Sequence, residues 1–289
     1  MITSTLSDGA LERNVVVGDT TVTYIDSVGE GDGRTPLVLV HGTGGRPDTH
    51  FNYIFPMLAT RGRVIAVQLA DPADRDKTGR IIDIADYAEQ IAGVIADAAP
   101  GQRVALIGYS LGAVATAVTA ARHPELIESL TLVSGWAHTD NQQLLRSDVW
   151  FDLYASGSEK IKEYTVFCAF GGPFLAAKNR ADLQPAIDVV TVNEYMAAQM
   201  DLNRRIDIRD ELERIDAPTL IVGGTYDVMV PLRHQKYLFG AIEDARLTEI
   251  AAGHAVVFER PAELIRVIEN FTGNPQEHPA GTRIPALKP

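Results

Sequence analysis

Short apolar runs rich in β-branched residues alternate along the chain with longer stretches of helical spacing. The first two runs, at 14–18 and 20–28, flank a turn at Gly18 and Asp19 and predict an antiparallel hairpin. Six further runs are continuous, as is typical of strands buried on both faces of a parallel sheet, and lie at 36–42, 63–69, 103–110, 129–135, 219–224 and 247–253. Helical stretches at 83–99 and 111–124 separate the middle runs. This alternation predicts an α/β fold.

The interval 136–216 departs from the alternation, because its roughly eighty residues hold helical segments and many aromatics but no convincing strand. A crossover between neighbouring strands is usually far shorter. We therefore expect a helical cap at 136–216 over the carboxyl edge of the sheet, where open α/β sheets bind ligands. The core would comprise 1–135 and 217–271. Residues 272–289 contain four prolines and two glycines and are expected to form a flexible tail outside the core.

The composition is that of a folded protein without a basic surface. Hydrophobic residues make up 46% of the 289 residues, enough for a core, and the net charge of −12 comes with no basic block. This charge argues against nucleic acid or an anionic membrane as partner. No secretory signal and no apolar run long enough to span a membrane is recognisable. The single cysteine, Cys168, is expected to be a small buried residue and excludes an internal disulfide. A reducing cytoplasm fits best, and a homodimer stays open.

The sharpest local signal is the GxSxG motif from Gly108 to Gly112, at the end of an expected strand and the start of an expected helix. A strand-to-helix turn of this kind is tight, so its flanking positions are glycines and its serine hydroxyl is held exposed. Ser110 is therefore the candidate nucleophile. The alternative is an ordinary glycine-rich turn with a capping serine.

An alcohol is a weak nucleophile near neutral pH, so Ser110 needs a base, and the base needs an orienting acid. His254 follows the last expected strand and a glycine, which makes it the candidate base rather than a structural histidine. Asp227 lies on the loop after the run 219–224 and is the candidate acid rather than a turn aspartate. Asp140, after an earlier strand, is the second choice for the acid.

The order nucleophile, acid, base is the one found in α/β-hydrolases. The chain resembles that superfamily through four motifs in sequence, which are HGTGG at 41–45, GYSLG at 108–112, GGTYDVMVP at 223–231 and GHAVVFERP at 253–261. The resemblance implies a mostly parallel eight-stranded sheet with helices on both faces and an inserted helical cap. It also implies an oxyanion hole made by the backbone N–H groups of Thr43 and Leu111. His41 is expected to tie loops together rather than to act as a second base.

The type of nucleophile narrows the chemistry. Related haloalkane dehalogenases and epoxide hydrolases place aspartate at this turn, so Ser110 disfavours those reactions and suits acyl chemistry. The cap is rich in aromatics, and a few facing the sheet would line a mainly apolar pocket. Met196 and Met200 are expected on the core face of a helix. The candidate substrate-binding residues are Gly42, Tyr109, Trp136, Trp150, Tyr154, Phe167 and Val228.

The leading hypothesis is a serine hydrolase that cleaves a small, mostly apolar ester, lactone or thioester through an acyl-enzyme intermediate. The same three side chains could also hydrolyse a carbon–carbon bond in a vinylogous diketone, or serve a biosynthetic acyltransferase or cyclase. A non-catalytic ligand-binding protein is the remaining alternative. We expect a small-molecule substrate, no cofactor and no metal, because no cluster shows metal-ligand spacing.

Overall fold

The computed structural model describes residues 2, 3, 6–28, 33–73, 75 and 79–286. The strands are β1 (Ile2–Thr3), β2 (Leu11–Val17), β3 (Thr20–Asp26), β4 (Leu37–Val40), β5 (Val64–Gln68), β6 (Val104–Tyr109), β7 (Ile127–Val133), β8 (Thr219–Gly224), β9 (Ala245–Ile250) and β10 (Arg283–Ile284). The helices are α1 (Pro47–His50), α2 (Ile54–Ala59), α4 (Ile84–Ala98), α5 (Leu111–Arg122), η1 (Pro124–Leu126), α6 (Asn141–Ala155), α7 (Lys160–Ala169), α8 (Gly172–Ala176), α9 (Arg180–Asp188), α10 (Glu194–Arg204), η2 (Arg209–Arg214), α11 (Arg233–Ala241), α12 (Val256–Glu259) and α13 (Pro261–Gly273).

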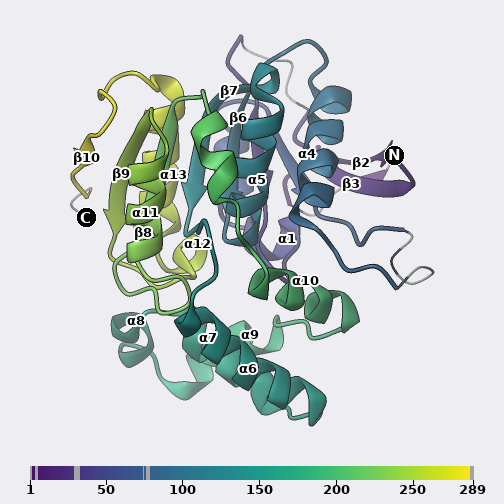
Figure 1. The fold of residues 1–289 in the computed structure, drawn as a ribbon, viewed down its shortest axis with the longest axis vertical. Coiled ribbons are helices and arrows are strands. Elements are labelled where there is room, and N and C mark those ends of the chain that lie inside the picture. The colour runs from purple at the N-terminus through teal and green to yellow at the C-terminus, as the bar shows by residue number, and fades with distance from the viewer. Residues whose placement is uncertain (1, 4–5, 29–32, 74, 76–78, 287–289) are drawn as a thin grey trace.

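The described strands form one sheet in the order β1-β2-β3-β5-β4-β6-β7-β8-β9-β10 (Figure 1). The pairs β1–β2, β2–β3 and β3–β5 are antiparallel, and all the others are parallel. The eight strands expected from the apolar runs are β2 to β9, and a two-residue strand extends the sheet at each edge. β6 is buried along its whole length, as a central parallel strand with covered faces should be.

Helices cover both faces of the sheet. Successive side chains of a strand point to opposite faces, so Val38 and Val40 of β4 pack in one apolar core with α4 and α5. Leu39, between them, packs in the other core with α2, α12 and α13. Because β4, β6, β8 and β9 are parallel, the loops at their carboxyl ends meet at one edge of the sheet. The helices α6 to α10, which we call the cap helices, lie together beyond that edge (Figure 1).

The inserted segment is smaller than the sequence suggested. Trp136 at its start, and Ile208 and Leu212 near its end, are buried in the main core rather than in the cap. Between them the chain enters and leaves through a narrow neck, where Thr139 N–H donates to the carbonyl of Ile206 at 3.0 Å. The boundary at 216 was wrong because the apolar residues after 205 face the sheet's own helices, which the absence of a strand pattern did not reveal.

The expectation of a free tail at 272–289 was also wrong for its described part. Residues 272 and 273 still belong to α13, and β10 pairs in parallel with the edge strand β9. The buried Arg246 donates from Nε to the carbonyl of His278 at 2.7 Å and from Nη2 to Gln276 Oε1 at 3.1 Å. Proline and glycine there prevent regular structure, but an edge strand with open hydrogen-bonding groups still attracts the segment. Residues 287–289 lie outside the described part.

Candidate active site

Ser110 lies at the sharp turn between β6 and α5. Its backbone has φ 58° and ψ −121°, a left-handed conformation that non-glycine residues rarely adopt. The flanking glycines allow the close approach that the turn needs. A Cβ at Gly108 would lie 2.3 Å from Thr116 Oγ1, and one at Gly112 would lie 2.3 Å from the carbonyl oxygen of Val40. The turn therefore holds the Ser110 side chain at the carboxyl edge of the sheet.

The loops after β8 and β9 bring Asp227 and His254 to this serine. His254 Nε2 lies 2.8 Å from Ser110 Oγ, and His254 Nδ1 lies 2.8 Å from Asp227 Oδ2. Only a protonated Nδ1 can donate to the carboxylate, so Nε2 is free to accept the serine proton. Asp227 Oδ1 accepts the N–H groups of Met229 and Val230 at 2.9 and 2.8 Å, which fixes the carboxylate. The arrangement can remove a proton from Ser110 and stabilise the resulting imidazolium.

Asp140, the second choice for the acid, is committed elsewhere. Its Oδ1 accepts the N–H of Gln143 at 3.1 Å and caps the start of α6. Its Oδ2 forms an ion pair with Arg233 and lies 3.2 Å from His234 Nε2. Burial opposes ionisation, but these partners outweigh it and hold the pKa of the Asp140 carboxyl below its usual value. Asp140 thus anchors the cap helices to α11.

The loop after β4 faces the start of α5. A Cβ at Gly42 would lie 2.8 Å from Ser110 Cβ, so glycine is needed for the loop to come this close. Among the described residues, the backbone N–H of Thr43 has no hydrogen-bond acceptor. The N–H of Leu111, in the first turn of α5, has no intrahelical partner either. Two free donors therefore flank the serine from different elements.

Two histidines hold this loop, the buried His41 and the half-buried His50. Leu69 N–H donates to His41 Nε2 at 3.1 Å, and His41 Nδ1 donates to the carbonyl of Gly42 at 2.8 Å. His50 Nδ1 accepts the N–H of Gly42 at 3.2 Å. Burial lowers the pKa of His41 to about 4 and that of His50 to about 3, so both rings are neutral near pH 7. The sequence analysis did not single out His50, which carries no motif of its own.

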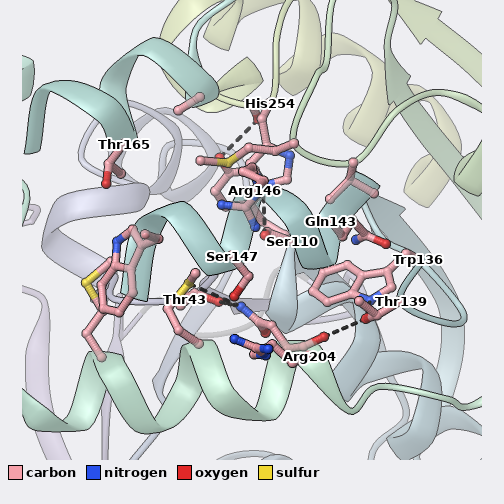
Figure 2. A pocket seen from close by; sticks show the side chains of 18 of the residues that line it. Thr43, Ser110, Trp136, Thr139, Gln143, Arg146, Ser147, Thr165, Arg204 and His254 are labelled. Carbon is pink, nitrogen blue, oxygen red and sulfur yellow. Dashed lines mark hydrogen bonds between the residues drawn. The ribbon is translucent and has the colours of Figure 1, made fainter. Parts of the chain in front are cut away.

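A cavity of about 130 Å³ lies between Ser110 and the cap helices (Figure 2). Tyr109, Trp136 and Trp150, three of the expected substrate-binding residues, line it. Tyr154 does not, because it stacks on the Trp150 ring at a centroid distance of 5.3 Å. Gly42 supports Ser110 from behind the cavity wall.

Phe167 and Val228, also expected to bind substrate, do not line this cavity. Phe167 is 66% exposed on the outer face of α7, whose inner face buries Val166 and Cys168. Val228 is 50% exposed, and the next residue in the chain, Met229, lines the cavity instead. Apolar character alone did not tell which side of each element faces inward.

Comparison with known proteins identifies the family. The sequence model of the alpha/beta hydrolase fold matches residues 35–261. The chain belongs to the α/β-hydrolase fold family, and it is a hydrolase.

It is 29% identical over 264 residues to a pyrrolizixenacetamide deacetylase from Xenorhabdus hominickii, covering 90% of this chain and 97% of that protein. A pimeloyl-[acyl-carrier protein] methyl ester esterase from Neisseria meningitidis is 24% identical, covering 89% of this chain and 83% of the esterase. The solved α/β hydrolase MGS-M2, from a Medee basin deep-sea metagenome library, superposes with a TM-score of 0.79 at 16% identity, over 91% of this chain and 98% of that one.

The hydrolase has polar groups in its cavity that the sequence analysis missed. Arg146 and Ser147 reach it from α6 (Figure 2). Asn203, on α10, also lines it. Met196 and Met200, expected on a core face, line the cavity and also pack with Trp150. On α6 the spacing of Arg146, Ser147 and Trp150 places these three cavity-lining side chains on one face of the helix. That spacing is visible in the sequence, but nothing in it indicated which face looks toward Ser110.

Glu259 links the cap helices of this hydrolase to the His254 loop. Its Oε1 accepts the N–H of Gly171 at 2.8 Å and the N–H of Gly253 at 3.0 Å. A third link joins Ala255 N–H to the carbonyl of Ala169 at 2.8 Å. Burial raises the pKa of the Glu259 carboxyl despite these two hydrogen bonds. The position of His254 therefore depends on the cap as well as on the sheet.

The described part of this hydrolase gathers no group of three His, Cys, Asp or Glu side chains that could hold a metal ion. Cys168 is buried and unpaired with another cysteine, and burial raises the pKa of its thiol. None of the described helices is both long and apolar enough to cross a membrane.

Proposed function

We propose that this hydrolase cleaves a carboxylic ester, lactone or thioester through an acyl-enzyme intermediate on Ser110. One observation carries the proposal, which is the hydrogen-bonded chain from Asp227 through His254 to Ser110 at 2.8 Å for each link. The position of the three residues at the ends of β8, β9 and β6 supports the same roles. The small cavity beside Ser110 suits a small-molecule substrate.

In the first half of the reaction, Ser110 Oγ attacks the substrate carbonyl carbon while its proton passes to His254 Nε2. The carbonyl oxygen becomes negative and accepts hydrogen bonds from the N–H groups of Thr43 and Leu111. Asp227 accepts from Nδ1 and stabilises the imidazolium. The tetrahedral intermediate then collapses, the carbon–oxygen or carbon–sulfur bond to the leaving group breaks, and His254 returns its proton to that leaving group.

In the second half, water attacks the acyl carbon of the ester on Ser110. His254 Nε2 takes a proton from the water, and a second tetrahedral oxyanion forms at the same two N–H groups. When this intermediate collapses, the proton returns to Ser110 Oγ and the carboxylic acid product leaves. Free enzyme is restored without any cofactor.

The names of the relatives favour acyl chemistry and widen its range. One describes a deacetylase and the other a methyl ester esterase, so both refer to removal of an acyl or ester group. The deacetylase matches over 90% of this chain, and it is the reason to test acetamides beside acetyl esters. Carbon–carbon bond hydrolysis and acyl transfer to an alcohol or amine use the same nucleophile and are distinguished by their products.

The proposal is tested by labelling with a fluorophosphonate probe followed by intact-mass and peptide analysis. We expect one adduct on Ser110 in the wild type, none in Ser110→Ala, and normal labelling in the control Ser156→Ala, whose side chain is exposed on the cap. The three proteins are then assayed on matched acetyl esters, thioesters and acetamides. Absence of an adduct on folded wild-type protein, or ester turnover by Ser110→Ala equal to that of the wild type, would reject the proposal.

A further inference from the structure

One positively charged side chain of the cavity, that of Arg146, has no acidic partner among the described residues. Arg146 lies on α6 and lines the cavity together with Ser110 and His254 (Figure 2). Its Nε is buried and has no hydrogen-bond partner, and the described part of the chain offers it no ion pair. Arg146 is half-buried, and a charge that is partly withdrawn from water without a partner is costly, so such an arginine is uncommon unless a ligand completes it.

Arg204 provides a contrast within the same cavity. Its Nη2 lies 2.9 Å from Asp148 Oδ1, and its guanidinium lies 5.3 Å from the centre of the Phe151 ring. Its charge is therefore compensated by α6, and it fastens α10 to that helix. Arg146 is on the same helix as Asp148 but has no such partner.

The charge of the cavity is opposite to that of the whole protein. The chain has a net charge of −12, yet the described residues that line the cavity include two arginines and neither aspartate nor glutamate. The Asp227 carboxylate lies behind His254 and is engaged by that ring. An acidic protein with a cationic cavity favours an anionic ligand there.

Two further donors lie beside Arg146 on the same face of α6. Ser147 and Trp150 line the cavity, and the Ser147 hydroxyl and the Trp150 indole N–H are buried atoms without a hydrogen-bond partner among the described residues. An indole N–H can only donate, and an arginine can only donate. Buried donors normally find acceptors, so three unpartnered donors on one helix face indicate a missing acceptor.

Burial lowers the pKa of the Arg146 guanidinium, and the nearby Cys168, Tyr164 and, to a smaller extent, Asp227 oppose this shift. The guanidinium stays charged at neutral pH, because its pKa starts far above that range. A carboxylate matches the planar fork of arginine with two parallel hydrogen bonds, and it also accepts from a hydroxyl or an indole.

We propose that the substrate of this hydrolase carries a carboxylate group, which binds to the Arg146 guanidinium, beside Ser147 and Trp150, while its ester, thioester or lactone carbonyl lies at Ser110. This assignment rests on the proposed function for the reaction and adds the substrate class. It replaces the mostly apolar substrate that the cap aromatics suggested. Arg146 is then the residue that determines specificity, and Trp136 and the methionines surround the apolar part of the substrate.

The first test compares charged and neutral esters that differ in one group. The monomethyl esters of succinate, glutarate and adipate carry a free carboxylate, and the dimethyl esters of the same acids do not. Proton release gives kcat/KM for each. We expect the wild type to prefer at least one monomethyl ester over its dimethyl counterpart by about 10-fold or more, as a charge-assisted hydrogen-bond pair would give. Raising the salt concentration should weaken the preference.

Substitutions assign the preference to one residue. Arg146→Met should lower kcat/KM for the preferred monomethyl ester about 10- to 100-fold and leave the dimethyl ester within about 3-fold. Arg146→Lys keeps the charge without the fork and should restore part of the preference. The control Arg283→Met removes an exposed arginine outside the cavity and should retain the preference. An equal fall on both esters in a folded Arg146→Met, or a wild type that cleaves both equally, would overturn the assignment.

A binding measurement separates the carboxylate site from the reaction. Calorimetry with glutarate is carried out on Ser110→Ala and on Ser110→Ala combined with Arg146→Met. Binding that is lost in the double variant supports the carboxylate site even if no ester is cleaved, in which case only the proposed reaction fails. If the wild type cleaves charged and neutral esters equally, and glutarate binds both variants with the same affinity, the proposed reaction is supported and the carboxylate site is rejected.

Discussion

The backbone at Ser110 predicts that replacing this residue by glycine gives a more stable protein than replacing it by alanine, although both variants are inactive. Its φ of 58° lies where a Cβ is disfavoured and glycine is at ease. Ser110→Gly relieves this strain. Ser110→Ala is the matched control, because it also loses the hydroxyl and its hydrogen bond to His254 but keeps the Cβ.

The difference between these two variants gives the size of the effect. A non-glycine residue in a conformation of this kind costs about 1–3 kcal/mol. Glycine makes the unfolded chain more flexible and so costs the folded state about 0.4–1 kcal/mol relative to alanine. We therefore expect Ser110→Gly to be more stable than Ser110→Ala by about 0.5–2 kcal/mol. For a chain of this size that is a rise in Tm of about 1–4 °C.

Urea unfolding followed by circular dichroism, with a thermal scan beside it, measures the difference between the variants. Both should lack ester turnover and fluorophosphonate labelling. If Ser110→Gly were less stable than Ser110→Ala, the turn would not be strained, and the packing of the Cβ against the Gly42 loop would outweigh the backbone term.

Three further predictions concern the glycine turn, the proposed acid and the buried Asp26 of β3. Gly112→Ala would place a Cβ 2.3 Å from a backbone carbonyl oxygen of β4 and should lower the unfolding free energy by about 2 kcal/mol or more. The control Gly240→Ala, in α11, adds a Cβ that meets no atom within 4 Å and should raise the unfolding free energy by about 0.5–1 kcal/mol. Urea unfolding midpoints compare the two variants. Asp227→Asn leaves one acceptor oxygen for two backbone N–H groups and the imidazole. Its amide N–H should face His254 Nδ1 and force the imidazole proton to Nε2, which lowers kcat about 10⁴-fold without unfolding the protein. Steady-state assays measure kcat, and circular dichroism checks the fold. Burial alone would raise the pKa of Asp26, but hydrogen bonds and charge from Arg63 lower it. Asp26→Asn should therefore destabilise the protein at pH 7, and the difference in unfolding free energy from the wild type, measured in urea, should disappear as the pH falls below about 4. A difference that is independent of pH would contradict this.

The fold could be predicted from the sequence wherever burial is two-sided. The strands β4 to β9 appear as continuous apolar runs because both of their faces are covered, and β6 is the clearest case. The segments around Ile208 and His278 could not be assigned. Ile208 continues no regular pattern but is buried against core helices, and His278 is held through its backbone carbonyl by the buried Arg246. Neither interaction leaves a periodic trace in the sequence.

The candidate site was predictable where it depends on topology. Ser110, Asp227 and His254 each follow a parallel strand, so their meeting follows from strand order and the motifs around them. The residues that line the cavity could not be predicted, because they depend on how α6 and α7 are rotated above the sheet. A pattern of apolar residues indicates that a helix has a buried face but not what that face meets. The sequence therefore pointed to Phe167, which lies outside the cavity, and did not point to Arg146, which lines it.

The neck of the insertion has a consequence for how this protein can change. Ala137 and Thr139 on one side are hydrogen-bonded to Ile208 and Ile206 on the other, at 2.8 and 3.0 Å, so the chain leaves and re-enters the core at almost the same point. A short turn could therefore close the gap, or a foreign segment could be grafted there, without disturbing the strand order. The proposed nucleophile, acid and base belong to the core, whereas Arg146, Ser147 and Trp150 belong to the insertion. An exchanged insertion would alter selectivity and keep the reaction centre in place only if it preserved the two contacts of the cap with the His254 loop, from Gly171 to Glu259 and from Ala169 to Ala255.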